Sequence, residues 1–126
     1  MKKIFCLMVI VLFVIISGCT VISEDSIVGR WHVTHIANIR VTDNEYYYWF
    51  RADKKFYRSE YKSDLEEPID PWDIDIHDGT YTLSGVKLDC KFESGGSDFQ
   101  VDAYTKDNGK IMLWYINGIE MTLESY

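Results

Sequence analysis

The sequence predicts an all-β protein, an antiparallel up-and-down barrel of eight strands, or of nine if 72–77 forms a strand of its own. Two observations predict this fold. Apolar and polar residues alternate with a period of two along most of the chain, and turn residues interrupt the alternation at short intervals. Short connections make successive strands antiparallel, and a long meander loses its edges most simply by closing into a barrel. An open two-sheet sandwich is the competing arrangement.

The first expected strand is the longest, 28–41. One of its faces carries Gly29, Trp31, Val33, His35, Ala37, Ile39 and Val41. The other expected strands are 45–51, 56–62, 72–77, 80–84, 86–93, 98–105, 110–116 and 119–126. Turns are expected at 42–44, 53–55, 84–85, 94–97 and 107–109, and Asn117-Gly118 is a strong hairpin signal.

The stretch 63–71 is irregular. Ser63 and Glu66 have the spacing of a capping box, but Pro68 limits any helix to about one turn.

The N-terminus has the layout of a secretory signal. Lys2 and Lys3 precede an apolar run at 4–16, and Ile16-Ser17-Gly18-Cys19 ends it with small residues before a cysteine. The run is shorter than the roughly 20 residues that a membrane-spanning helix needs. An uncleaved anchor helix is the alternative.

Ile16-Ser17-Gly18-Cys19 resembles the lipobox of bacterial lipoproteins. The resemblance implies a signal peptide at 1–18, cleavage before Cys19, and a diacylglycerol on the Cys19 thiol. A polar linker would then occupy 19–26 and a domain 27–126. We expect attachment to a membrane of the cell envelope, the outer membrane in a bacterium that has two, because Thr20 rather than aspartate follows the cysteine.

The length, charge and cysteine content of the chain limit the classes of function that it can have. Removal of 1–18 leaves 108 residues, enough for one domain, with 11 basic and 20 acidic side chains. This negative charge disfavours binding to nucleic acid or to anionic lipid head groups, and we expect a monomer. Cys90 is the one cysteine left for the folded domain, and it alternates with polar neighbours, so we expect a small core residue rather than a disulfide partner.

Two segments resemble lipocalins and the wider calycin group. Gly29-Arg30-Trp31 matches the Gly-x-Trp that opens their first strand, and 81–88 is similar to the central hairpin of bacterial lipocalin-like domains. Over 27–126 the resemblance implies an eight-stranded barrel closed at one end by Trp31 and a small lipophilic ligand. The chain departs from lipocalins in having no helix after the last strand, no late arginine in 119–126, and Thr42-Asp43 in a different connection.

The barrel interior is the candidate ligand site. The residues expected to bind a ligand there are Trp31, His35, Tyr48, Phe50, Tyr81 and Phe99, with Leu88, Phe92, Leu113 and Met121 also facing inward. Side chains this bulky could equally fill the interior completely. His35 would orient a polar end of the ligand or serve as a hydrogen-bonded core histidine.

The sequence gives little indication of a metal site or of a catalytic site. The segment 73–79 alternates carboxylates with apolar residues, but its glycine is one place late for a calcium loop and Ser84 replaces the expected glutamate. An edge strand with acidic residues facing water explains the same pattern. No catalytic motif is present, so we expect no metal, no cofactor and no enzymatic activity.

Two classes of function remain. One is a binding protein for a small hydrophobic molecule in the interior. The other is a protein-interaction or inhibitor module that uses its loops and rim, with the acidic region 64–78 and the exposed-looking Tyr47 and Trp49. Membrane-bound lysozyme inhibitors are small lipid-anchored barrels of this second kind, although their motifs match poorly at Ser84-Gly85 and at 104–107.

Overall fold

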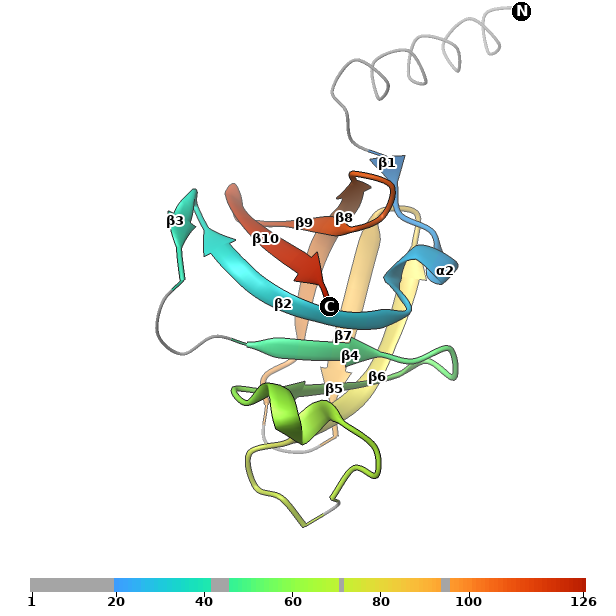
Figure 1. The fold of residues 1–126 in the computed structure, drawn as a ribbon. Coiled ribbons are helices and arrows are strands. Elements are labelled where there is room, and N and C mark those ends of the chain that lie inside the picture. Colours follow the sequence, from blue (N-terminus) through green and yellow to red (C-terminus); the bar gives the residue numbers. More distant parts are fainter. Residues whose placement is uncertain (1–19, 42–45, 71, 94–95) are drawn as a thin grey trace, which may run out of the picture.

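The structure, a computed structural model, describes residues 20–41, 46–70, 72–93 and 96–126 (Figure 1). The signal peptide 1–18, the lipidated Cys19, the turn at 42–44 and the first half of the turn at 94–97 lie outside the described residues. The anchor therefore stays a prediction.

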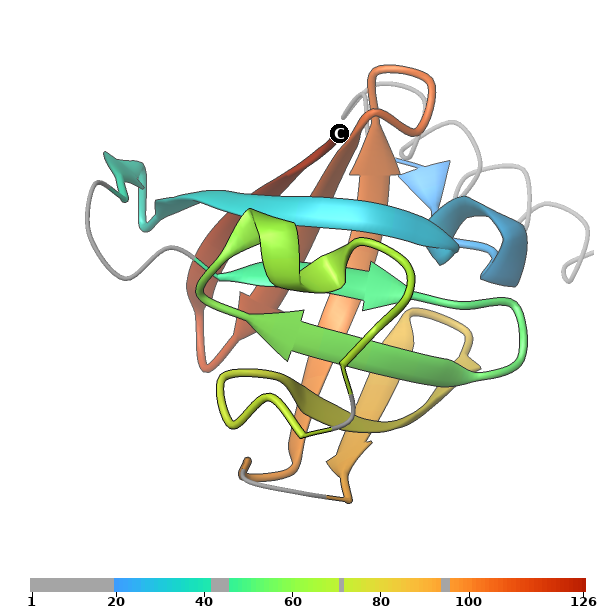
Figure 2. The same cartoon turned by 60° about the horizontal axis from the view of Figure 1, so that its bottom comes forward.

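Eight strands of the described chain form a closed antiparallel barrel (Figures 1 and 2). They are β2 (Gly29–Ile36), β4 (Tyr47–Phe50), β5 (Lys55–Ser59), β6 (His77–Ser84), β7 (Lys87–Phe92), β8 (Phe99–Lys106), β9 (Ile111–Ile116) and β10 (Ile119–Ser125). Each strand pairs with the next, and β10 pairs with β2 to close the ring. The predicted all-β up-and-down barrel is confirmed, with eight strands rather than nine, and the open sandwich is excluded.

The long first strand predicted at 28–41 is wrong. The chain turns at Ala37 and Asn38, whose φ angles are 51° and 65°, and β3 (Ile39–Arg40) folds back to pair with β2. Positive φ at both central residues is the geometry of a two-residue hairpin, and asparagine adopts it readily. The apolar positions 37, 39 and 41 continue the expected inner face through the turn, and Ile36 on the otherwise polar face was the one exception in the pattern.

Two other expectations need correction. No strand forms at 72–76, and β6 begins at His77, so the described residues between β5 and β6 belong to one long connection, the loop 60–76, in which η1 is the regular element. The helix limited by Pro68 does form, as the 3-10 helix η1 (Lys62–Leu65). Tyr61 rather than Ser63 is its N-cap residue, and no side chain caps it.

Residues 20–26 are not a free linker. β1 (Thr20–Val21) pairs with β8, and the one-turn helix α2 (Glu24–Ile27) has Ser23 as its N-cap, whose hydroxyl accepts a hydrogen bond from the Ser26 amide. Ile22 and Ile27 are buried because they cover one end of the core. The apolar side chains of Ile22 and Ile27 were the feature of the sequence that could have predicted this burial. β1 thus joins the sheet one residue after Cys19.

The buried core lies inside the barrel, between two distinct ends. At the end where β2 begins, the Trp31 indole is 2% exposed and donates a hydrogen bond to the Ile27 carbonyl at 2.8 Å. We call this the closed end. The opposite end, where β5 stops and β6 starts, is called the mouth. The expected burial of Trp31 and Cys90 in the core is confirmed.

Leu113 does not lie on the inner face that the sequence suggested. Its neighbours Met112 and Trp114 belong to the buried core cluster, while Leu113 is buried outside that cluster. The run Ile111–Ile116 is apolar on both faces, so alternation could not decide which residues point inward.

Candidate functional site: the mouth of the barrel

The predicted ligand residues are largely packed against one another in the interior. Trp31, Tyr48, Phe50 and Tyr81 are buried, and Phe99 is half-buried against the same core. Ring centroids lie 5.1 Å apart for Tyr48 and Trp114 and 5.6 Å apart for Phe99 and Trp114. Phe50 and Tyr81 make a further edge-on pair at 5.1 Å. Such pairs stabilise a core, so these rings have a structural role whatever else they do.

His35 is not on the inner face with them. The pairing of β2 with β10 shifts at Thr34, so that Val33 faces Leu123 but His35 faces Thr122. The side chain of Thr122 points away from the core that its neighbours Met121 and Leu123 contact, and His35 shares its outer side. The predicted inward position of His35 is therefore wrong, because a one-residue irregularity reverses strand parity.

Arg58 caps the interior at the mouth. It follows the buried Phe56 on the inner face of β5, and its guanidinium carbon lies 4.6 Å from the centre of the Phe92 ring and 5.0 Å from that of Tyr46. These distances are those of cation–π contacts. Its Nε is buried and has no hydrogen-bond partner. Arg58 was not among the predicted site residues, although an arginine on the apolar face of a strand was the available signal.

Burial also changes the pKa of the Tyr48 hydroxyl, which interacts with Arg58. Loss of solvation raises the pKa of Tyr48 to about 12, and the charge and hydrogen bond of Arg58 oppose this rise in part. The hydroxyl is thus neutral at any physiological pH. Burial likewise raises the pKa of the Cys90 thiol, which keeps it protonated and unreactive.

A small polar hollow lies outside Arg58. Its volume is about 180 Å³, and it is lined by Tyr46, Arg58, Ser59, Glu60, Asp75 and His77. Pockets for drug-sized ligands occupy about 300 Å³ or more. The hollow therefore suits one side chain or a small polar group. A larger, shallow hollow of about 490 Å³ lies on the outer surface between Arg51 and Tyr57 on one side and Glu67, Pro68 and Ile69 on the other.

The first part of the loop, around η1, is held against the barrel. Leu65 in η1 is completely buried, and η1 lies over the outer faces of β4 and β5 (Figure 2). Arg30 Nε donates a hydrogen bond to the Leu65 carbonyl at 2.9 Å, and Ser59 Oγ donates one to Asp64 Oδ2 at 2.7 Å. These contacts attach η1 to the outer face of the barrel.

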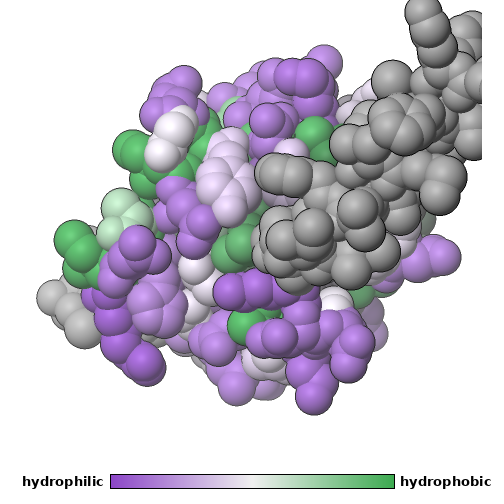
Figure 3. All heavy atoms as spheres, turned by 90° about the horizontal axis from the view of Figure 1, so that it is seen from above, coloured by the Kyte–Doolittle hydropathy of each residue, from purple (hydrophilic) through white to green (hydrophobic). Residues whose placement is uncertain are grey.

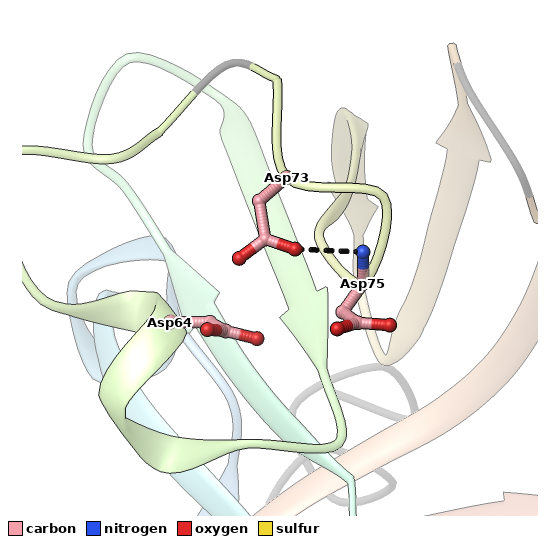
Figure 4. Close-up of side chains that lie close together, drawn as sticks. All are labelled: Asp64, Asp73 and Asp75. Atoms are coloured by element: carbon pink, nitrogen blue, oxygen red, sulfur yellow. Dashed lines mark hydrogen bonds between the residues drawn. The ribbon is translucent and has the colours of Figure 1, made fainter.

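Three carboxylates of this loop converge (Figure 4). Oxygen atoms of Asp64, Asp73 and Asp75 all lie within 4.8 Å of one another, and Asp73 Oδ1 accepts a hydrogen bond from the Asp75 amide at 2.9 Å. Like charges at this separation repel, so the group favours a positive charge nearby, either a hard cation with oxygen ligands or a basic side chain. The pattern 73–79 pointed to two of these residues. Asp64 was missed, because it comes from a distant part of the loop.

The most exposed apolar side chains of the described chain belong to the same loop. Trp72 is 88% exposed and Ile74 is 87% exposed. Tyr47 and Trp49, which the sequence suggested as exposed, are half-buried on the outer face of β4. Tyr47 stacks on His32 with ring centroids 4.4 Å apart, and Arg30 lies 4.2 Å above the Trp49 ring. The most exposed aromatic residue of the described chain is thus Trp72 rather than Tyr47 or Trp49.

A second exposed apolar group borders the mouth. It consists of Ile36, Ile39 and Ile119 on the β2–β3 and β9–β10 hairpins. The face seen from above is otherwise mostly hydrophilic, with hydrophobic residues gathered on the side where β3 lies (Figure 3).

No family model matches the chain, and no curated protein and no solved structure is significantly similar to it. The resemblance to lipocalins therefore stays a prediction from the motifs. Among the helices that the structure describes, none has the length and apolar character needed to cross a membrane.

Proposed function

We propose that this chain is a lipid-anchored protein of the cell envelope that binds another protein through the mouth of its barrel and the loop 60–76. The observation that carries the proposal is the contrast between an interior of contacting aromatic rings and a loop that exposes Trp72 and Ile74 almost completely. Exposed aromatic side chains are common anchors of protein interfaces. The role is recognition, with no enzymatic step.

The position of the expected lipid anchor supports an orientation in which the loop 60–76 points away from the membrane. Thr20, the residue after Cys19, pairs with Thr105 at the closed end, whereas the loop 60–76 joins β5 to β6 at the mouth. Figure 1 accordingly shows β1 and the loop on opposite sides of the molecule. A lipid on Cys19 would hold the closed end next to the membrane and direct the loop away from it.

One observation favours a second candidate function, binding of a small hydrophobic molecule in the interior. Trp114 Nε1 is buried there without a hydrogen-bond partner. A ligand with one acceptor atom would satisfy it, and the isoleucines at the mouth would border its path. In this candidate the ligand would contact the rings around Trp114, among them Tyr48 and Phe99.

Photo-crosslinking in the native host tests the proposal. A benzoylphenylalanine residue replaces Ile74 in the full chain, and the control carries it at Val28, which is exposed at the closed end. We expect a discrete protein adduct from position 74 and none from position 28. Equal adducts from both positions would contradict the proposal. A lipophilic molecule found by native mass spectrometry, without an adduct from position 74, would favour the second candidate.

A further inference from the structure

We propose that the small polar hollow outside Arg58 binds a free α-amino acid, with the carboxylate of the ligand at Arg58 and its ammonium group toward Glu60 and Asp75. Such a ligand lies beyond the proposed function, because it is a small molecule rather than a protein. Three features of the hollow support this site: the unpaired charge of Arg58, the carboxylates in the lining, and the volume.

The first feature is the unpaired charge of Arg58. On β5 this residue lies between its cross-strand neighbours Tyr48 and His77. Its guanidinium hydrogen-bonds to the Tyr48 hydroxyl, and its buried Nε has no partner. Among the residues that the structure describes, no carboxylate forms an ion pair with it. A charge removed from water is costly unless it is paired, so a carboxylate supplied by a ligand would stabilise Arg58.

The second feature is the presence of two acidic residues, Glu60 and Asp75, in the lining of the same hollow. Both are exposed, whereas Arg58 is half-buried above the core. The hollow therefore has its positive group toward the core and its negative groups toward solvent. The carboxylates would repel a simple anion, and Arg58 would repel a simple cation. A molecule that carries both charges close together matches this arrangement.

The remaining lining residues supply hydrogen-bond donors suited to a carboxylate. The Tyr46 hydroxyl and a ring nitrogen of His77 can each donate one hydrogen bond, and both residues line the hollow. A guanidinium can donate two parallel hydrogen bonds to one carboxylate, which favours Arg58 as the main contact. Ser59 differs, because its hydroxyl already donates to Asp64 Oδ2.

The third feature is the size of the hollow and its surroundings. A volume of about 180 Å³ accommodates a small amino acid such as glycine or alanine and is below that of sites for drug-sized ligands. The Phe92 and Tyr46 rings lie 4.6 Å and 5.0 Å from the guanidinium carbon of Arg58 and limit its contact with water. Attraction between this guanidinium and a carboxylate is stronger where water is excluded.

Calorimetry tests the site with the full chain in a non-ionic detergent, dialysed against buffer free of amino acids. The probes are alanine, propionate, which lacks the ammonium group, and alaninamide, which lacks the carboxylate. We expect alanine to bind at least about tenfold more tightly than either analogue, because each analogue leaves one charge of the hollow unpaired. Alanine should also shift the NMR signal of the Arg58 Nε–H group, since its carboxylate binds the same guanidinium.

Matched variants locate the two charges of the ligand. Arg58→Lys keeps the charge but loses the paired donors, so it weakens alanine binding about tenfold. Glu60→Gln, at an exposed position, weakens alanine binding about threefold to tenfold and strengthens propionate binding, because it removes a negative charge. The controls are Arg40→Lys and Glu124→Gln, both exposed and outside the hollow, and neither changes the affinity. If Arg58→Lys does not fold, the opposite responses to Glu60→Gln still decide the question.

Three results would overturn the amino-acid site: no binding of alanine, equal binding of alanine and propionate, or equal losses in the control variants. Equal binding of propionate would mean that Arg58 accepts a carboxylate alone, such as an acidic side chain of a protein partner. The crosslink from position 74 does not depend on these outcomes. The proposed function therefore stands if that crosslink forms and alanine does not bind.

Discussion

The same strands form both ends of the barrel, but one end is covered by apolar side chains and the other exposes polar and aromatic side chains to solvent. At the closed end, Ile22 and Ile27 cover the core, and the buried Trp31 indole donates its hydrogen bond to a backbone carbonyl. At the mouth, Arg58 caps the core with a buried Nε that lacks a partner, and three carboxylates crowd together in the loop that also exposes Trp72. Both ends carry a tryptophan, but one is used for packing and the other is left to solvent.

The difference separates stability from recognition. Apolar burial at the closed end lowers the free energy of the folded state by removing surface from water. Exposed apolar and like-charged side chains at the mouth contribute nothing of this kind and cost stability in part. Local features that conflict with stability are concentrated at functional sites, which is why the mouth is the better candidate for binding.

The largest expected effect compares the two tryptophans. Trp31→Ala removes a buried side chain and its hydrogen bond, so we expect the free energy of unfolding to fall by about 3–5 kcal/mol. Trp72→Ala, at an 88% exposed position, should change it by less than about 0.5 kcal/mol. Urea unfolding of both variants measures the difference. Similar losses would show that the loop contributes to the fold as much as the closed end does.

The next effect concerns the attachment of the loop. Leu65→Ala removes the buried contact that holds η1 against β4 and β5, at a cost of about 2–5 kcal/mol. Because the loss falls on the loop, hydrogen exchange of the Asp64 amide, which donates to the Tyr61 carbonyl, should accelerate at least about thirtyfold. Amides of β9 and β10 should be unaffected. Uniform acceleration across the barrel would mean that the loop and the strands unfold as one unit.

The third effect uses pH to probe the interior below the mouth. The raised pKa of Tyr48, about 12 when folded against 10 in the unfolded chain, stabilises the protein below pH 10. That stability, of order 2–3 kcal/mol, is lost as pH rises from about 10 to about 12, since the unfolded chain releases the proton first. Cys90, whose pKa is also raised, adds to the loss. Tyr48→Phe should reduce the alkaline loss measured by urea unfolding, and an unchanged pH dependence would contradict the assignment.

The sequence was sufficient for the barrel and insufficient for its mouth. Alternation and the Asn117-Gly118 turn reveal which strands pair, since both are local signals. The turn at Ala37 keeps the apolar residues of one expected face in phase, so the sequence did not separate β3 from β2. The irregularity at Thr34 depends on the pairing with β10, so the sequence placed His35 on the wrong face. The carboxylate group joins Asp64 to residues nine and eleven positions later through the fold of a loop, which no periodic pattern encodes.

The smallest effect tests whether the mouth is built at the expense of stability. Asp75→Asn removes one of three converging charges but keeps the amide that donates to Asp73, so we expect stabilisation of about 0.5–1 kcal/mol at low salt. Asp75 is exposed, and salt screens exposed charges, so the gain should vanish near about 0.5 M sodium chloride. Urea unfolding at both salt concentrations measures it, with Asp107→Asn as the control at an exposed carboxylate outside this group. Destabilisation by Asp75→Asn would mean that a cation bound to the three carboxylates already balances their charge, and that the mouth is occupied before any partner arrives.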